Sequence, residues 1–141
     1  MKIGFFDSGI GGITVLNEAI KQLPNEDYIY FADTDNTPYG VKPKDEVKKY
    51  ILAAIDFIYA KGVDAIVIAC NTATSIAIED LREKYNIPIL GMEPAVKPAI
   101  EKNHSTNKRV LVTATPLTLK EEKLKNLMTC DLKRKSQNGL T

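Results

Sequence analysis

A cysteine lies where an apolar run gives way to small polar residues, in the segment VIACNTATS at residues 67–75. A free cysteine most often packs inside a core as a small hydrophobic residue. Cys70, however, directly precedes a segment predicted to be helical, which Asn71 or Thr72 is expected to cap. Unpaired amides and the dipole at a helix N-terminus favour a thiolate over a thiol. The position leaves two interpretations open, a buried structural residue or a reactive thiol.

A glycine-rich segment, DSGIGG at residues 7–12, follows the first predicted strand. Its glycines allow a sharp turn or a close approach to a ligand, and the next helix could hold an anion at its N-terminus. The segment lacks the Gly-Lys-Ser/Thr of a phosphate-binding loop, and Thr14 stands where a dinucleotide fingerprint has its third glycine. A carboxylate ligand fits the same amides. The alternative is an ordinary strand-to-helix turn capped by Asp7 or Ser8.

The other polar side chains limit the chemistry that the thiol could perform. A cysteine nucleophile normally needs a histidine partner, but the only histidine, His104, lies in a remote polar stretch. One histidine and two distant cysteines also argue against a zinc site. A thiolate acting as a base, tuned by a nearby aspartate, fits these residues better. Asp33 with the Pro-Tyr-Gly segment at residues 38–40 could belong to such a site, although taken alone it predicts only a turn.

Hydrophobic periodicity predicts the elements that would position these residues. Strands are expected at residues 2–6, 28–32, 64–69, 87–90 and 109–113, and helices at residues 11–23, 45–60, 72–85, 93–102 and 117–127. Pro98 argues for a kink or a late start in the fourth helix. Five alternations of strand and helix predict a parallel, doubly wound α/β sheet. Because such sheets bind ligands at the carboxyl ends of their strands, we expect a site for a small polar molecule there.

Composition narrows the class of protein. The chain has 141 residues, which predicts one globular domain, and its net charge of +1 argues against binding to nucleic acid or an anionic membrane. The apolar runs are too short to span a bilayer, and no signal peptide is expected. Two cysteines are too few for a disulfide framework. These features favour a cytoplasmic protein.

Several of these motifs, in their order and spacing, resemble the glutamate racemases of the aspartate/glutamate racemase family. They are the segment DSGIGG at residues 7–12, Asp33 with the Pro-Tyr-Gly segment, and ACNTA at residues 69–73. The segment ATPLT at residues 114–118 resembles a later Ala-Thr-x-x-Thr motif of the family. The resemblance covers about residues 1–127. Aspartate racemases share the Asn-Thr-Ala motif but lack this form of the opening loop.

The resemblance implies cofactor-independent interconversion of L- and D-glutamate, which supplies D-glutamate for peptidoglycan. It also implies a flavodoxin-like fold that forms one half of a two-domain racemase, with no metal. Two cysteines would face opposite sides of the substrate α-carbon, and one thiolate would remove the proton while the other thiol returns one. By this likeness Cys70 is the base acting on the D-enantiomer, Asp7 assists it, and Asp33 is a further assisting candidate. Substrate-binding residues would be Ser8, Tyr39, Gly40, Asn71, Thr72 and Thr118.

The sequence departs from the family because it contains no Cys-Thr-His motif, which carries the second cysteine in the second half. Cys130 is followed by Asp131 and does not match. We therefore expect a racemase domain at residues 1–127 and an irregular basic tail at residues 128–141, as a truncated or frameshifted gene would produce. The missing half would leave apolar surface exposed, which predicts marginal stability or self-association.

Three functions stay open. The first is a glutamate racemase whose second half comes from a complementing chain or from another copy in a homo-oligomer. The second is a non-catalytic remnant that binds a dicarboxylic amino acid without turnover. The third, a phosphate- or nucleotide-binding flavodoxin-like domain, is disfavoured because both phosphate-binding fingerprints fail.

Overall fold

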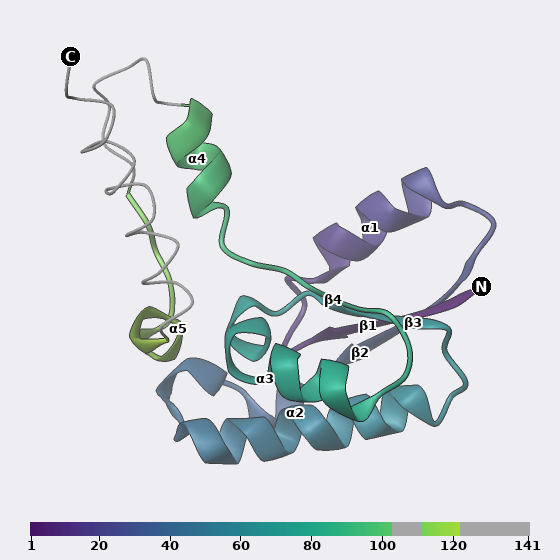
Figure 1. Cartoon of the computed structure of the whole chain (residues 1–141), viewed down its shortest axis with the longest axis horizontal. Coiled ribbons are helices and arrows are strands. Elements are labelled where there is room, and N and C mark those ends of the chain that lie inside the picture. The colour runs from purple at the N-terminus through teal and green to yellow at the C-terminus, as the bar shows by residue number, and fades with distance from the viewer. Residues whose placement is uncertain (103–110, 122–141) are drawn as a thin grey trace.

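The computed structural model describes residues 1–102 and 111–121 and has strands and helices in alternation (Figure 1). The strands are β1 (Lys2–Asp7), β2 (Asp27–Ala32), β3 (Ala65–Ile68) and β4 (Ile89–Gly91). The helices are α1 (Ile13–Gln22), α2 (Lys44–Tyr59), α3 (Asn71–Lys84), α4 (Val96–Lys102) and α5 (Pro116–Lys120), with 3₁₀ turns η1 (Thr34–Asn36) and η2 (Tyr39–Val41). No helix in these ranges is both long enough and apolar enough to cross a membrane.

The four strands form one parallel sheet in the order β2-β1-β3-β4. Helices α2 and α3 cover one face of this sheet, and α1 lies on the other (Figure 1). The predicted parallel, doubly wound α/β fold is therefore confirmed. Connections leave β1 and β3 toward opposite edges of the sheet, so the topological switch point lies between these two central strands.

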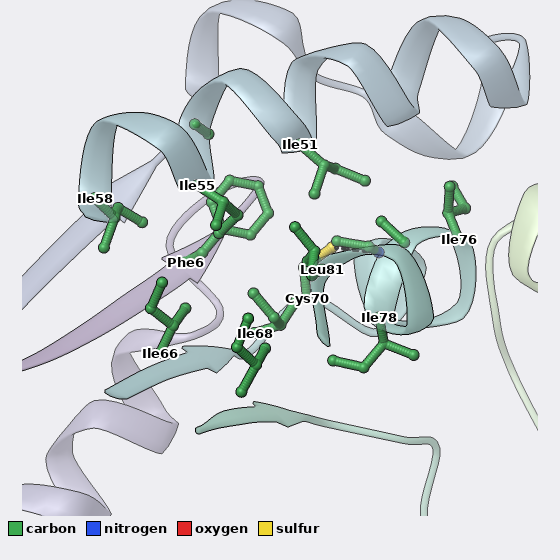
Figure 2. Packing of buried hydrophobic residues seen from close by; sticks show 14 of the residues in the cluster. Phe6, Ile51, Ile55, Ile58, Ile66, Ile68, Cys70, Ile76, Ile78 and Leu81 are labelled. Atoms are coloured by element: carbon green, nitrogen blue, oxygen red, sulfur yellow. Dashed lines mark hydrogen bonds between the residues drawn. The ribbon is translucent and has the colours of Figure 1, made fainter. Parts of the chain in front are cut away.

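The main core lies between the sheet and helices α2 and α3 (Figure 2). Helix α2 presents buried residues at helical spacing, namely Val47, Ile51, Ala54, Ile55 and Ile58. They meet Phe6 of β1 and Ile66 and Ile68 of β3, all of which are completely buried. Burial of each such isoleucine or phenylalanine stabilises the fold by about 1.5–3 kcal/mol. This core fixes the carboxyl ends of β1 and β3 relative to each other.

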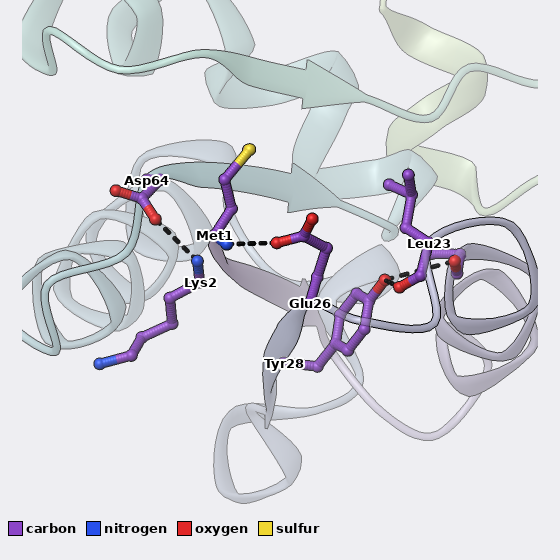
Figure 3. A network of polar contacts seen from close by, with 7 residues as sticks. Met1, Lys2, Leu23, Glu26, Tyr28 and Asp64 are labelled. Carbon is purple, nitrogen blue, oxygen red and sulfur yellow. Dashed lines mark hydrogen bonds and ion pairs between the residues drawn. The ribbon is translucent and has the colours of Figure 1, made fainter.

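Polar contacts fix the amino ends of the strands (Figure 3). The Met1 amine pairs with Glu26, and the Lys2 N–H donates to Asp64 Oδ2 at 2.7 Å. Tyr28 donates its hydroxyl to the Leu23 carbonyl oxygen at 2.7 Å, which ties β2 to the end of α1. These contacts lie at the edge of the sheet opposite to Asp7 and Cys70.

The structure changes the expectations for the last part of the chain. Helix α4 begins at Val96 instead of residue 93, which confirms the late start expected from Pro98. With this start Pro98 lies in the first turn of the helix, where its missing N–H is not needed. Residues 111–115 form no strand, so the strand expected at residues 109–113 is wrong for the part that is described. Helix α5 starts at Pro116. His104, Cys130 and the tail at residues 128–141 lie outside the described residues.

Candidate active site

A cavity of about 720 Å³ opens at the switch point, beyond the carboxyl ends of β1 and β3. The loop after β1, the start of α3, the β4–α4 connection and residues 111–118 form its walls. Among the predicted site residues, those that line it are Asp7, Cys70, Asn71, Thr72 and Thr118. The topology thus brings to one place residues that are more than 60 positions apart in the chain.

Cys70 is the N-cap of α3, with an extended backbone at φ −76° and ψ 116°. Its Sγ accepts the Ala73 N–H at 3.4 Å and donates to Ser8 Oγ at 3.5 Å. The expectation that Asn71 or Thr72 caps this helix is wrong, because β3 ends early enough for Cys70 itself to occupy the cap. A helix N-terminus with an N–H donor aimed at sulfur stabilises negative charge there.

Asp7 is buried at the end of β1 and holds the glycine-rich loop. Its Oδ2 accepts the Gly12 N–H at 2.9 Å. Gly12 is the N-cap residue of α1, and the first turn of this helix has no capping hydrogen bond from a side chain. Neither Asp7 nor Ser8 therefore occupies the cap position. A Cβ on Gly12 would lie 2.8 Å from Ala69 Cβ and 2.9 Å from Asp7 Cβ. Glycine is therefore needed here for close packing of the loop against β1 and β3.

Asp33 is buried beside Tyr39, and both of the Asp33 carboxylate oxygens accept hydrogen bonds. Tyr39 donates its hydroxyl to Oδ2, and Asn36 Nδ2 donates to Oδ1 at 2.8 Å. Burial first, and then the hydrogen bond to Asp33, raise the pKa of Tyr39 far above its usual value, so its hydroxyl stays protonated. Asp33 therefore fixes η2, the turn that contains Tyr39 and Gly40.

Three threonine hydroxyls form a hydrogen-bonded triangle on the wall formed by α3 and α5. Thr72 Oγ1 lies 3.0 Å from Thr118 Oγ1 and 3.2 Å from Thr115 Oγ1, and the last two atoms lie 3.0 Å apart. Gly40 packs against this group, since a Cβ there would lie 2.5 Å from Thr115 Cβ. The triangle thereby joins η2 and α5 to the first turn of α3. These hydroxyls could donate hydrogen bonds to a carboxylate ligand in place of those that they make with one another.

The remaining predicted residues are not among those that line the cavity. Ser8 reaches Cys70 from the loop, whereas Asp33, Tyr39 and Gly40 support the walls from outside. Sequence reasoning did not select Thr115 or Gly12 as site residues, although both lie in motifs that it singled out. No cluster of three histidine, cysteine or acidic side chains able to hold a metal ion occurs within residues 1–102 and 111–121.

Comparison with known proteins gives consistent matches. A family model described as Asp/Glu/Hydantoin racemase matches residues 13–131. The chain is 65% identical over 128 residues to the glutamate racemase of Halothermothrix orenii, covering 91% of this chain and 50% of that protein. It is 66% identical to glutamate racemase 2 of Bacillus subtilis, with 91% and 48% covered.

A solved structure extends this similarity to the fold. The glutamate racemase from Campylobacter jejuni superposes with a TM-score of 0.79 at 42% identity, covering 92% of this chain and 52% of that one. The chain therefore spans about half the length of the curated relatives that it matches.

Proposed function

The chain belongs to the Asp/Glu/hydantoin racemase family, and on this premise we propose that it forms one half of a glutamate racemase site. The observation that carries the proposal is the position of Cys70. Its sulfur caps α3 at the switch point, contacts Ser8, and shares a cavity with the carboxylate of Asp7. We propose glutamate as the substrate, because the matched relatives are named glutamate racemases.

The walls of the cavity supply donors for a dicarboxylic amino acid. Hydroxyl groups of Thr72 and Thr118 lie on one side, and Asn71 with Ser8 lies near the sulfur. The α-proton of an amino acid is very weakly acidic, so its removal requires donors that stabilise the carbanion-like transition state. We assign Ser8, Asn71, Thr72 and Thr118 to substrate binding. Tyr39 and Gly40 support this wall from its outer side, where Gly40 packs against Thr115, and Asp33 holds them in place.

The proposed reaction is a proton exchange at the α-carbon. The Cys70 thiolate takes the α-proton of D-glutamate and becomes a thiol, while the electron pair left on carbon delocalises into the carboxylate. A second acid then delivers a proton to the opposite face, which gives L-glutamate. Asp7 assists proton transfer at Cys70. Cys70 is the only cysteine within the described ranges, and Cys130 does not match the Cys-Thr-His motif of the family. We therefore propose that the second acid comes from a complementing half or from another copy of the chain.

We further propose a cellular role that is consistent with the family. D-Glutamate made in this way would serve cell-wall peptidoglycan synthesis in the cytoplasm. We place the racemase domain at residues 1–127 and treat residues 128–141 as an extension outside it.

The proposal is tested with the 141-residue chain in deuterium oxide. D-Glutamate is added, and loss of its α-proton signal is followed by NMR, with Cys70→Ser as the control. Exchange that disappears in the variant supports a working base at Cys70. Saturable binding of D-glutamate without exchange would instead favour a binding remnant. Absence of both binding and exchange would overturn the assignment of this half-site.

A further inference from the structure

Two tyrosines of β2 hold α1 to the sheet from opposite ends of the helix. Tyr28 and Tyr30 are two residues apart and therefore point to the same face of the sheet, the face that carries α1. The Tyr28 hydroxyl donates to the Leu23 carbonyl at 2.7 Å, after the last turn of α1 (Figure 3). The Tyr30 hydroxyl donates to the Gly9 carbonyl at 2.8 Å, in the loop before the helix. Only the second contact is at the active-site edge.

The Tyr30 hydroxyl also closes the packing around Gly12. A Cβ on Gly12 would lie 3.0 Å from the Tyr30 oxygen, 2.9 Å from Asp7 Cβ and 2.8 Å from Ala69 Cβ. These three side chains thus surround the residue whose N–H donates to Asp7 Oδ2. Burial first, and then the charge of Asp7, raise the pKa of Tyr30. The hydroxyl therefore remains a donor at neutral pH.

The loop between these two contacts carries a residue that touches the thiol. Gly9 follows Ser8, whose Oγ accepts the Cys70 thiol at 3.5 Å. Apart from Gly9 and its two chain neighbours, no described residue has an atom within 4 Å of the place where a Cβ on Gly9 would be, so side-chain packing does not confine the loop there. The Tyr30 bond to the Gly9 carbonyl and the Asp7 bond to Gly12 are side-chain contacts that hold this loop next to Ser8.

We propose that Tyr30 is a positioning residue of the site, because its hydroxyl clamps the loop at residues 8–12 and so keeps Ser8 and Asp7 beside Cys70. This inference rests on the proposed function and adds to it a residue from β2 that lies outside every motif singled out in the sequence. Tyr30 acts on the reaction through Gly9 and Gly12 and does not itself touch the substrate.

The test compares Tyr30→Phe with Tyr28→Phe. Each variant removes one hydroxyl from the same strand together with its contacts to backbone carbonyl oxygens, that of Gly9 for Tyr30 and those of Leu23 and Ala19 for Tyr28, so both are expected to lower the melting temperature. Tyr30→Phe should also lower the maximal rate of α-proton exchange from D-glutamate by about tenfold or more, with the half-saturating concentration changed less than about twofold. Tyr28→Phe should leave both quantities near wild type. Equal losses of exchange in the two variants, or none in Tyr30→Phe, would overturn the proposal.

A second readout needs no glutamate. Because the clamp holds Ser8 against the thiol of Cys70, a residue that is only 7% exposed, loss of the clamp should speed the alkylation of Cys70 by iodoacetamide several-fold in Tyr30→Phe but not in Tyr28→Phe. If the wild-type chain exchanges no α-proton, the proposed function fails, yet this alkylation difference still decides the role of Tyr30. Identical alkylation rates in wild type and both variants would show that the hydroxyl does not hold the loop.

Discussion

At the scale of single residues, Cys70 combines a structural contact with the proposed chemistry. Its sulfur accepts the Ala73 N–H as the cap of α3 and also contacts Ser8. A serine in this place keeps an oxygen that can cap the helix, whereas an alanine leaves that N–H without its partner. The two substitutions therefore separate the cap from the chemistry, because both abolish the thiol.

We expect the free energy of unfolding of Cys70→Ala to be about 1 kcal/mol lower than that of Cys70→Ser. Urea unfolding followed by circular dichroism measures this difference. Neither variant should exchange the α-proton of glutamate. Equal stability of the two variants would mean that a side-chain acceptor at position 70 contributes nothing as a cap.

Gly12 and Gly9 form a matched pair in the same loop. Gly12→Ala places a methyl group against Ala69 and Asp7, and the resulting overpacking should cost about 1–3 kcal/mol of stability. Gly9→Ala meets open space among the described residues and should stay within about 0.5 kcal/mol of wild type. Thermal and urea unfolding of both variants check this. A neutral Gly12→Ala would contradict the close packing between the loop and the central strands.

The sequence predicts which candidate residues meet at one edge of the sheet better than it predicts which residues support them. Cys70 and Asp7 were selected because polar residues at strand ends meet at one edge of a parallel sheet. Tyr30 could not be selected, because inside an aromatic strand its hydroxyl gives no sign of its partner. The expected cap of α3, Asn71 or Thr72, lies one or two residues after the observed cap Cys70, since the pattern does not show where β3 stops.

At the scale of elements, periodicity predicts α2 and its buried face well, because a helix with one apolar stripe has few alternatives. It fails at residues 111–113, which have apolar character but form no strand. A strand depends on hydrogen bonds to a neighbour, and local propensity does not supply that neighbour. Helix α1 was predicted from its apolar spacing, yet none of its residues is fully buried.

The carboxyl-terminal ends of α2 and α3 are joined by an ionic cluster outside the site. Asp56 accepts from Lys84 Nζ at 2.7 and 2.9 Å and from the Tyr85 hydroxyl at 2.5 Å. The hydrogen bond from Lys84 first, and then that from Tyr85, lower the pKa of Asp56. Its stabilising contribution is therefore complete above the unfolded pKa near 4 and is lost as the pH falls through the lower folded value.

We expect Asp56→Asn to destabilise the protein at pH 6 by less than about 1 kcal/mol, because the cluster is solvent-exposed. The difference from wild type should shrink as the pH falls below 4. Urea unfolding across this range measures it, and Lys84→Met should reproduce the effect. A difference that stays constant with pH would show that Asp56 is not held ionised by this cluster.

At the scale of the whole molecule, the chain spans about half the length of its curated relatives. Helix α1 exposes Ile13 and Ile20 at 40% each, with Leu23 beyond its end at 49%. The predicted self-association, which remains a prediction, would begin at such apolar surface. The family could be identified from motifs alone, whereas the packing that holds the site together required the structure.

The most direct test of the central claim compares the two enantiomers of glutamate in deuterium oxide. With Cys70 as the base on one face of the α-carbon, the wild-type chain should exchange the α-proton of D-glutamate faster than that of L-glutamate. Cys70→Ser should exchange neither. Exchange of D-glutamate that persists in Cys70→Ser, or no exchange by the wild-type chain with either enantiomer, would contradict the account.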